Sequence, residues 1–167
     1  MRFAFRQAVS VPPARAVAAY GTPAFYEGRP ARDDIEVVEV VRHEASGSRV
    51  LIEVRYAFKG SLSAAVRAVV HPDKMSWITR TEVLAAEART SWVVLPDHYP
   101  DRLTAGGEFR FEPGPDGPDT TVIAVGGELK VHVPVVGRSV ERVIVSGLQS
   151  YLEDEAATIP ESGPDSD

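Results

Sequence analysis

The last third of the chain contains the pattern that most constrains its fold. Residues 119–133 alternate apolar and polar side chains, as expected of a strand with one buried face. A Val-Pro-Val-Val-Gly run at 133–137 interrupts the alternation. From about residue 137 to residue 159, apolar residues recur every three or four positions, which predicts one long amphipathic helix. The concave side of an antiparallel sheet is the natural place for the apolar stripe of such a helix.

The predicted helix is long enough to span a sheet. At ~1.5 Å per residue it is on the order of 35 Å long, and a ten-residue strand at ~3.3 Å per residue is similar. A helix that lies within a curved sheet encloses a cavity, and a cavity allows a small domain to hold a ligand. The apolar stripe consists of Val140, Val143, Ile144, Gly147, Leu148, Tyr151, Leu152 and Ile159.

The rest of the chain predicts an α+β domain. Alternation and β-branched or aromatic residues predict strands at 2–9, 35–45, 49–58, 74–84, 89–95 and 103–112. Pro13 and Pro23 each predict the start of a short helix between the first two strands. Residues 61–70 fit either a short helix or a covering loop. We therefore expect a curved antiparallel sheet of about seven strands gripping the long C-terminal helix, in one domain over residues 1–159, followed by a disordered acidic tail at 160–167.

Composition excludes several classes of function. The chain of 167 residues fits one domain, and it has no cysteine for a disulfide, a thiolate metal site or a nucleophile. A formal charge of -6 disfavours nonspecific attraction to nucleic acid or anionic lipid. The first residues lack the apolar core of a signal peptide, and no apolar run approaches the ~20 residues of a membrane span. These features predict a cytoplasmic protein without stable membrane association.

The order of these elements resembles the helix-grip fold of the START-like (SRPBCC) superfamily. That superfamily includes birch-pollen-allergen-like proteins and polyketide cyclase/lipid-transport proteins. The resemblance is carried by Phe-Ala-Phe at 3–5, Val-Pro-Pro-Ala at 11–14 and residues 127–141, where Val-Pro-Val-Val-Gly is the most specific part. The match is closer still to a bacterial branch known only as a domain of unknown function.

The resemblance implies a cavity between sheet and helix that takes apolar or amphipathic small molecules. Members of the superfamily include enzymes, carriers and co-chaperones, so the resemblance does not choose among these activities. The bacterial branch has no established catalytic residues to carry over.

No motif of metal, nucleotide or acyl-transfer chemistry stands out. The four histidines, at 43, 71, 98 and 132, show no spacing typical of paired metal ligands. There is no GxSxG nucleophile elbow and no glycine-rich phosphate loop. The sequence therefore predicts neither a metal site nor a cofactor.

One strand carries two candidate catalytic side chains. In residues 35–45, Glu39 and His43 share the parity of Val37 and Val41, so both point toward the cavity if the register is unbroken. They would lie roughly 13 Å apart, at ~3.3 Å per residue, and both would reach one ligand. A bulge or an open end of the sheet would instead leave them in water.

Apolar and hydroxyl side chains on the same predicted face form a candidate ligand-binding wall. Such a lining suits a small-molecule pocket, and it equally suits an ordinary core. The predicted ligand-binding residues are Tyr56, Met75, Trp77, Thr79, Thr81, Trp92, Phe109, Ile144, Leu148 and Tyr151.

Three functions remain open at this point. The first is carriage or sensing of an apolar small molecule in the cavity. The second is an enzyme of cyclase or dehydratase type, in which Glu39 and His43 would act as general acid or base and Tyr56 as a donor. The third is a protein-interaction module without a ligand, which a large exposed apolar patch would favour.

Overall fold

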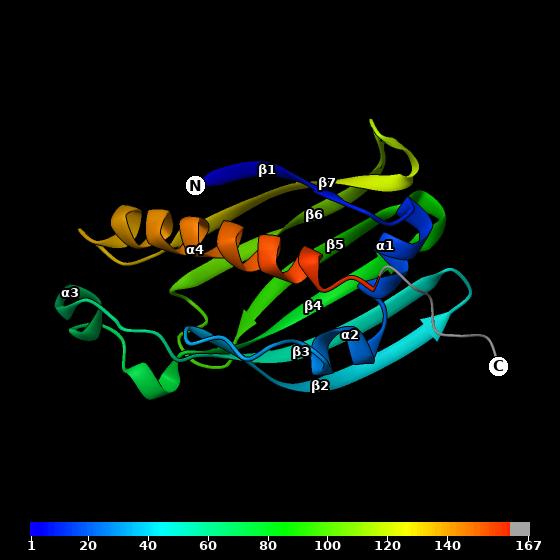
Figure 1. Ribbon diagram of the computed structural model, residues 1–167. Helices are drawn as coiled ribbons and strands as arrows, with labels where there is room; N and C mark the ends of the chain where they lie inside the picture. Colours follow the sequence, from blue (N-terminus) through cyan, green and yellow to red (C-terminus); the bar gives the residue numbers. More distant parts are fainter. Residues whose placement is uncertain (161–167) are drawn as a thin grey trace.

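The computed structural model describes residues 1–160 and confirms the expected sheet with a long C-terminal helix (Figure 1). Seven antiparallel strands form one sheet in the order β1-β7-β6-β5-β4-β3-β2. The strands are β1 (Arg2–Val9), β2 (Ile35–Ser46), β3 (Arg49–Phe58), β4 (Ser76–Leu84), β5 (Arg89–Pro96), β6 (Leu103–Gly114) and β7 (Gly117–Val131). The helices are α1 (Pro13–Ala19), α2 (Pro23–Glu27), α3 (Ala64–Arg67) and α4 (Gly137–Ala157), with 3-10 turns η1 (Pro72–Lys74) and η2 (Ala85–Glu87).

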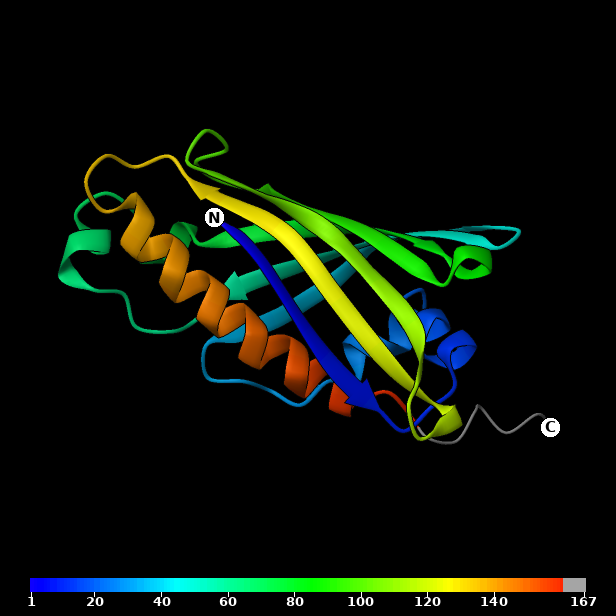
Figure 2. The same cartoon turned by 90° about the horizontal axis from the view of Figure 1, so that it is seen from above.

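Glycines in the middle of β6 and β7 permit the strong curvature of the sheet (Figure 2). Gly107 on β6 pairs directly with Gly127 on β7. A Cβ on Gly107 would clash with the carbonyl oxygen of Gly126 and lie 2.7 Å from the Cα of Gly127. Glycines inside strands mark places where backbones approach closely or bend. Here they let β6 and β7 curl, so that the sheet forms a concave face for α4.

Helix α4 lies over β1 and β7 on the concave face of the sheet. No helix of residues 1–160 covers the convex face (Figures 1 and 2). Its first turn is held by Glu141, whose Oε1 accepts a hydrogen bond of 2.9 Å from the backbone N–H of Val131. Gly137 permits this approach, because a Cβ there would lie 2.6 Å from the carbonyl oxygen of Val131. The last turns bury Tyr151 and Leu152 against the sheet.

Helices α1 and α2 fill one end of the concave face. Tyr20 follows α1 and packs on Phe109 and Phe111, with ring centroids 5.3 and 5.4 Å away. The hydroxyl of Tyr26 donates a hydrogen bond of 2.8 Å to the carbonyl oxygen of Tyr20, which joins the two helices. Because Val17 and Tyr20 are almost fully buried, this end contains a conventional aromatic core.

The structure also resolves the open points of the sequence prediction. Residues 61–70 contain the one-turn helix α3, whose residues are not buried. Strand β7 ends at Val131, two residues before the predicted boundary, and the chain then turns through Val135, which has a φ of 70°. No helix among residues 1–160 is long and apolar enough to cross a membrane. Apart from Pro160, the predicted disordered tail lies outside the described residues.

Candidate functional site

The concave face consists of two halves that differ in solvent access. Beneath α1 and α2 the inward side chains are at most 6% exposed, and we call them the closed half: Ile52, Val54, Val83, Thr90, Phe109, Phe111, Ile123 and Val125. Toward the first turns of α4 the inward side chains stay partly exposed. We call these the open half: Met75, Trp77, Thr79, Trp92, Val94, Ile144 and Leu148.

The open half is an apolar, aromatic surface. The ring of Trp77 stacks on that of Tyr56 at 5.7 Å between centroids. Trp92 contacts Phe3 and Phe109, each at 6.3 Å. Concave surfaces with aromatic walls and few polar groups are typical of small-molecule sites.

A buried ion pair lies at the inner end of the open half. Nη1 of Arg29 is 2.5 Å from Oε2 of Glu155, and both side chains are 5% exposed. The same Nη1 donates a hydrogen bond to the hydroxyl of Tyr151, and the ring of Tyr151 meets that of Tyr56 edge-on at 6.2 Å. We call Arg29, Glu155, Tyr151 and Tyr56 the Arg29 cluster. It joins the partly exposed surface at Trp77 to the interior.

Aromatic rings surround the guanidinium of the Arg29 cluster. Its carbon Cζ lies 4.5 Å from the centroid of Phe25 and 4.6 Å from that of Tyr26. Cation–π contacts of this kind contribute about 0.5–2 kcal/mol, more when they are desolvated. Helix α2 therefore positions Arg29 by packing as well as by chain connection.

Burial sets the charge states in the Arg29 cluster. It raises the pKa of Tyr56 to about 12, and it raises the pKa of Tyr151 further, so both hydroxyls stay protonated at neutral pH. Burial is the largest influence on Arg29 and disfavours its charge, but Glu155 together with the surrounding tyrosines outweighs this effect and raises the pKa of the guanidinium. Burial also raises the pKa of Glu155, against the attraction of Arg29. Glu155 is therefore the member of the ion pair that loses its charge as pH falls.

Several buried polar atoms near the concave face have no hydrogen-bond partner among residues 1–160. Folded proteins pair the great majority of such groups, because an unpaired one costs about 1–3 kcal/mol. The interior thus offers donors and acceptors to something other than the chain itself. The atoms are Nε and Nη2 of Arg29, Nε1 of Trp92, the hydroxyls of Tyr20 and Thr90 and both amide atoms of Gln7.

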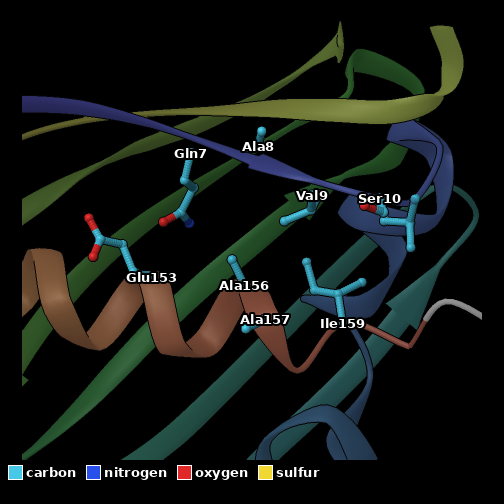
Figure 3. Close-up of a pocket in the computed structure, with 9 residues that line it drawn as sticks. Gln7, Ala8, Val9, Ser10, Glu153, Ala156, Ala157 and Ile159 are labelled. Carbon is cyan, nitrogen blue, oxygen red and sulfur yellow. The ribbon is translucent and has the colours of Figure 1, made fainter. Parts of the chain in front are cut away.

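A hollow lies at the rim, between β1 and the end of α4. It has a volume of about 320 Å³ and is lined by both elements. Figure 3 shows the side chain of Gln7 extending from β1 toward α4, with Glu153 across from it. This groove is a lateral opening beside the closed half.

The structure places the predicted wall residues on the concave side. Met75, Trp77, Thr79, Trp92, Ile144 and Leu148 lie in the open half, whereas Tyr56, Thr81, Phe109 and Tyr151 are buried. Val143, predicted on the apolar stripe of the helix, is instead 73% exposed. The buried stripe of α4 is narrower than the predicted apolar stripe, because Val143 lies outside the one face of the helix that meets the sheet.

The predicted shared face of Glu39 and His43 is wrong. Two register shifts interrupt β2, at Val38 and Val41, and each turns the following residues over. Glu39 therefore pairs with Arg55 on the outer face, with 3.4 Å between Oε1 and Nε.

The second shift restores the inward parity of His43, which pairs with Ile52. Its Nε2–H donates a hydrogen bond of 3.0 Å to the carbonyl oxygen of Gly21, at the end of the sheet covered by α1. The two side chains thus lie on opposite faces and do not reach one ligand. Bulges are frequent on edge strands, which β2 is.

Sequence reasoning missed Arg29 and Glu155. Arg29 lies in a loop between Gly28 and Pro30, where no periodicity indicates burial. Glu155 did leave a signal, because it falls four residues after Tyr151 and four before Ile159, on the apolar stripe itself. Among residues 1–160, no three His, Asp or Glu side chains converge as metal ligands would.

Comparison with known proteins agrees with this geometry. A family model described as "Protein of unknown function (DUF2505)" matches residues 4–161. No curated protein has a sequence that matches the chain.

Solved structures share the fold over nearly the whole chain. The Zhui aromatase/cyclase from Streptomyces sp. R1128 is 10% identical, with a TM-score of 0.60, over 94% of this chain and 92% of that one. A START superfamily protein from Mycobacterium smegmatis is 15% identical, with a TM-score of 0.58, over 95% and 96%. Norcoclaurine synthase from Thalictrum flavum is 14% identical, with a TM-score of 0.57, over 93% and 83%. These similarities confirm the START-like helix-grip fold.

Proposed function

We propose that this chain, which belongs to the family of unknown function matched over residues 4–161, binds an apolar or amphipathic small molecule in the open half. The proposal is based on its geometry. The observation that supports this most strongly is the partial exposure of Trp77 and Trp92 on the inner side of the sheet and of Leu148 on α4. Exposed apolar area costs roughly 25 cal/mol per Å², so a guest that covers it gains that free energy.

The unpaired buried polar atoms support the same proposal. A ligand with one or two polar groups would satisfy the donors of Arg29 and Trp92 while its apolar body covers the aromatic surface. The proposal is for binding or carriage. The pair Glu39 and His43 is not proposed as catalytic, because Glu39 faces outward beside Arg55.

Two adjacent residues on α4 provide a matched test. Ile144 lies in the open half and Val143 faces outward, so the same substitution at each places a carboxylate inside or outside the proposed site. The probe is N-phenyl-1-naphthylamine, a neutral apolar dye whose emission rises in apolar surroundings. We expect the wild type to bind the dye, Ile144→Glu to bind it at least tenfold more weakly, and Val143→Glu to bind it as the wild type does.

Circular dichroism of both variants tests whether they keep the fold. Absence of dye binding by the wild type would count against the proposal and favour an interaction module without a ligand. Equal affinity in the wild type and Ile144→Glu would place the dye outside the open half and contradict the proposed site.

A further inference from the structure

The Arg29 cluster points to the chemical class of the guest. We propose that the bound molecule presents a neutral hydrogen-bond-accepting oxygen, such as a carbonyl, to the Nε–H and Nη2–H groups of Arg29. This inference rests on the proposed binding function and assigns the polar end of the same site.

Two N–H groups on one edge of the guanidinium are left for such an oxygen. A guanidinium presents five N–H donors in a planar fork. Nη1 is used by Glu155 and Tyr151, whereas Nε and Nη2 have no acceptor among residues 1–160. The side chain is only 5% exposed, so bulk water does not compensate these donors.

The charge balance selects a neutral acceptor over a carboxylate. Glu155 already neutralises Arg29 at 2.5 Å, and both groups are removed from solvent. An ionised carboxylate bound at the free edge of Arg29 would add a second negative charge beside Glu155 in a medium of low dielectric constant. A carbonyl oxygen takes both hydrogen bonds without that repulsion.

The position of the Arg29 cluster indicates how the guest lies. Trp77 is partly exposed and stacks on Tyr56, Tyr56 contacts Tyr151, and Tyr151 accepts from Arg29. An apolar body on Trp77 and Leu148 therefore directs its polar end toward the tyrosine hydroxyls and the free guanidinium edge.

Competition between matched chains tests the inference. Three compounds are compared as competitors of N-phenyl-1-naphthylamine at about pH 7.5: 2-undecanone, the hydrocarbon undecane and ionised decanoate. We expect the ketone to compete at least tenfold better than the hydrocarbon, and better than decanoate. The measured quantity in each variant is the ratio of ketone affinity to hydrocarbon affinity.

Three variants test whether Arg29 is the cause of that ratio. Arg29→Met combined with Glu155→Met removes the donors without leaving a buried charge, so it is expected to fold. Arg29→Lys keeps the charge opposite Glu155 and loses the fork, so it serves if the double variant unfolds. In both variants the ratio should fall to near one. Arg110→Met, a control at an arginine that pairs with Glu108 on the outer face of the sheet, should keep the wild-type ratio.

The outcomes separate this inference from the proposed function. Dye binding with equal affinity for ketone and hydrocarbon overturns the inference and leaves binding in the open half intact. A preference for decanoate that Arg29→Lys preserves would also overturn it, because the site would then recognise charge. If the wild type binds neither the dye nor any of the three compounds, the proposed function and the inference both fail.

Discussion

The closed and open halves of the concave face are built from the same sheet but do different work. In the closed half, α1 and α2 cover the strands, and Phe109, Phe111 and Ile123 are buried among aromatic rings. In the open half, α4 lies over β1 and β7 and leaves Trp77 and Leu148 partly exposed. The difference shows that one end of the domain holds the fold together, whereas the other end keeps apolar surface available.

The Arg29 cluster lies at the boundary between the two halves. Its aromatic neighbours Phe25 and Tyr26 come from α2, on the closed side, and Tyr56 connects it to Trp77 on the open side. Folding buries the ion pair with two donors unpaired, a cost that the packing of the closed half has to offset.

The largest effect is expected from breaking the ion pair at this boundary. Arg29→Ala leaves the Glu155 carboxylate buried without its partner, which should lower the free energy of unfolding by about 3–5 kcal/mol. Replacing both residues by methionine removes both charges and should leave stability unchanged or raise it by about 1–4 kcal/mol. Urea unfolding followed by circular dichroism measures both. Equal losses in the single and double variants would mean that the two charges do not depend on each other.

The contrast between the halves is measured most directly with two isoleucines. Ile123 is 0% exposed in the closed half, and Ile144 is partly exposed in the open half. Ile123→Ala creates a cavity and should cost about 3 kcal/mol of unfolding free energy, whereas Ile144→Ala should cost about 1 kcal/mol or less. Chemical denaturation of both variants under one set of conditions compares them. Similar losses would show that the two halves are packed alike.

Sequence patterns predict the helices and strands but not the facing of Glu39 or the burial of Arg29. The seven strands, the long helix and the two short helices follow from periodicity and proline positions, and the structure confirms them. The facing of Glu39 could not be predicted, because it depends on a bulge at Val38 that alternating hydrophobicity does not encode. Arg29 could not be placed either, because its burial depends on tertiary packing against Phe25 and Tyr26.

A smaller, pH-dependent effect should come from Glu155. Burial raises the pKa of its carboxyl in the folded state above the ordinary value of 4.5, so the folded protein holds this proton more tightly than the unfolded chain. The stabilisation that comes from protonated Glu155 is therefore complete below about pH 4.5. It is lost as pH rises through the pKa of Glu155 in the folded state.

Glu155→Gln removes that titration and provides the comparison. The stability of the wild type minus that of the variant should decrease between about pH 4 and pH 7, measured by urea unfolding at several pH values. An increase over this range would mean that the attraction of Arg29 outweighs burial and lowers the pKa of Glu155.

The smallest effect is expected on the outer face, which belongs to neither half. Arg110 pairs with Glu108 at 2.6 Å, but its side chain is 62% exposed. Arg110→Ala should change the free energy of unfolding by less than about 1 kcal/mol, and salt should reduce the effect further. Thermal unfolding at low and high salt is sufficient to detect it. A loss comparable to that of Ile123→Ala would contradict the assignment of stability to the closed half.

The central claim, that the open half accepts an apolar guest, is tested most directly by following backbone amide signals in NMR during titration with N-phenyl-1-naphthylamine. We predict that signals of Trp77, Thr79, Trp92, Ile144 and Leu148 shift with saturation, while those of Ile52, Phe111 and Ile123 stay in place. Shifts confined to the closed half or to the outer face, or no shifts at concentrations where the dye is soluble, would contradict the account.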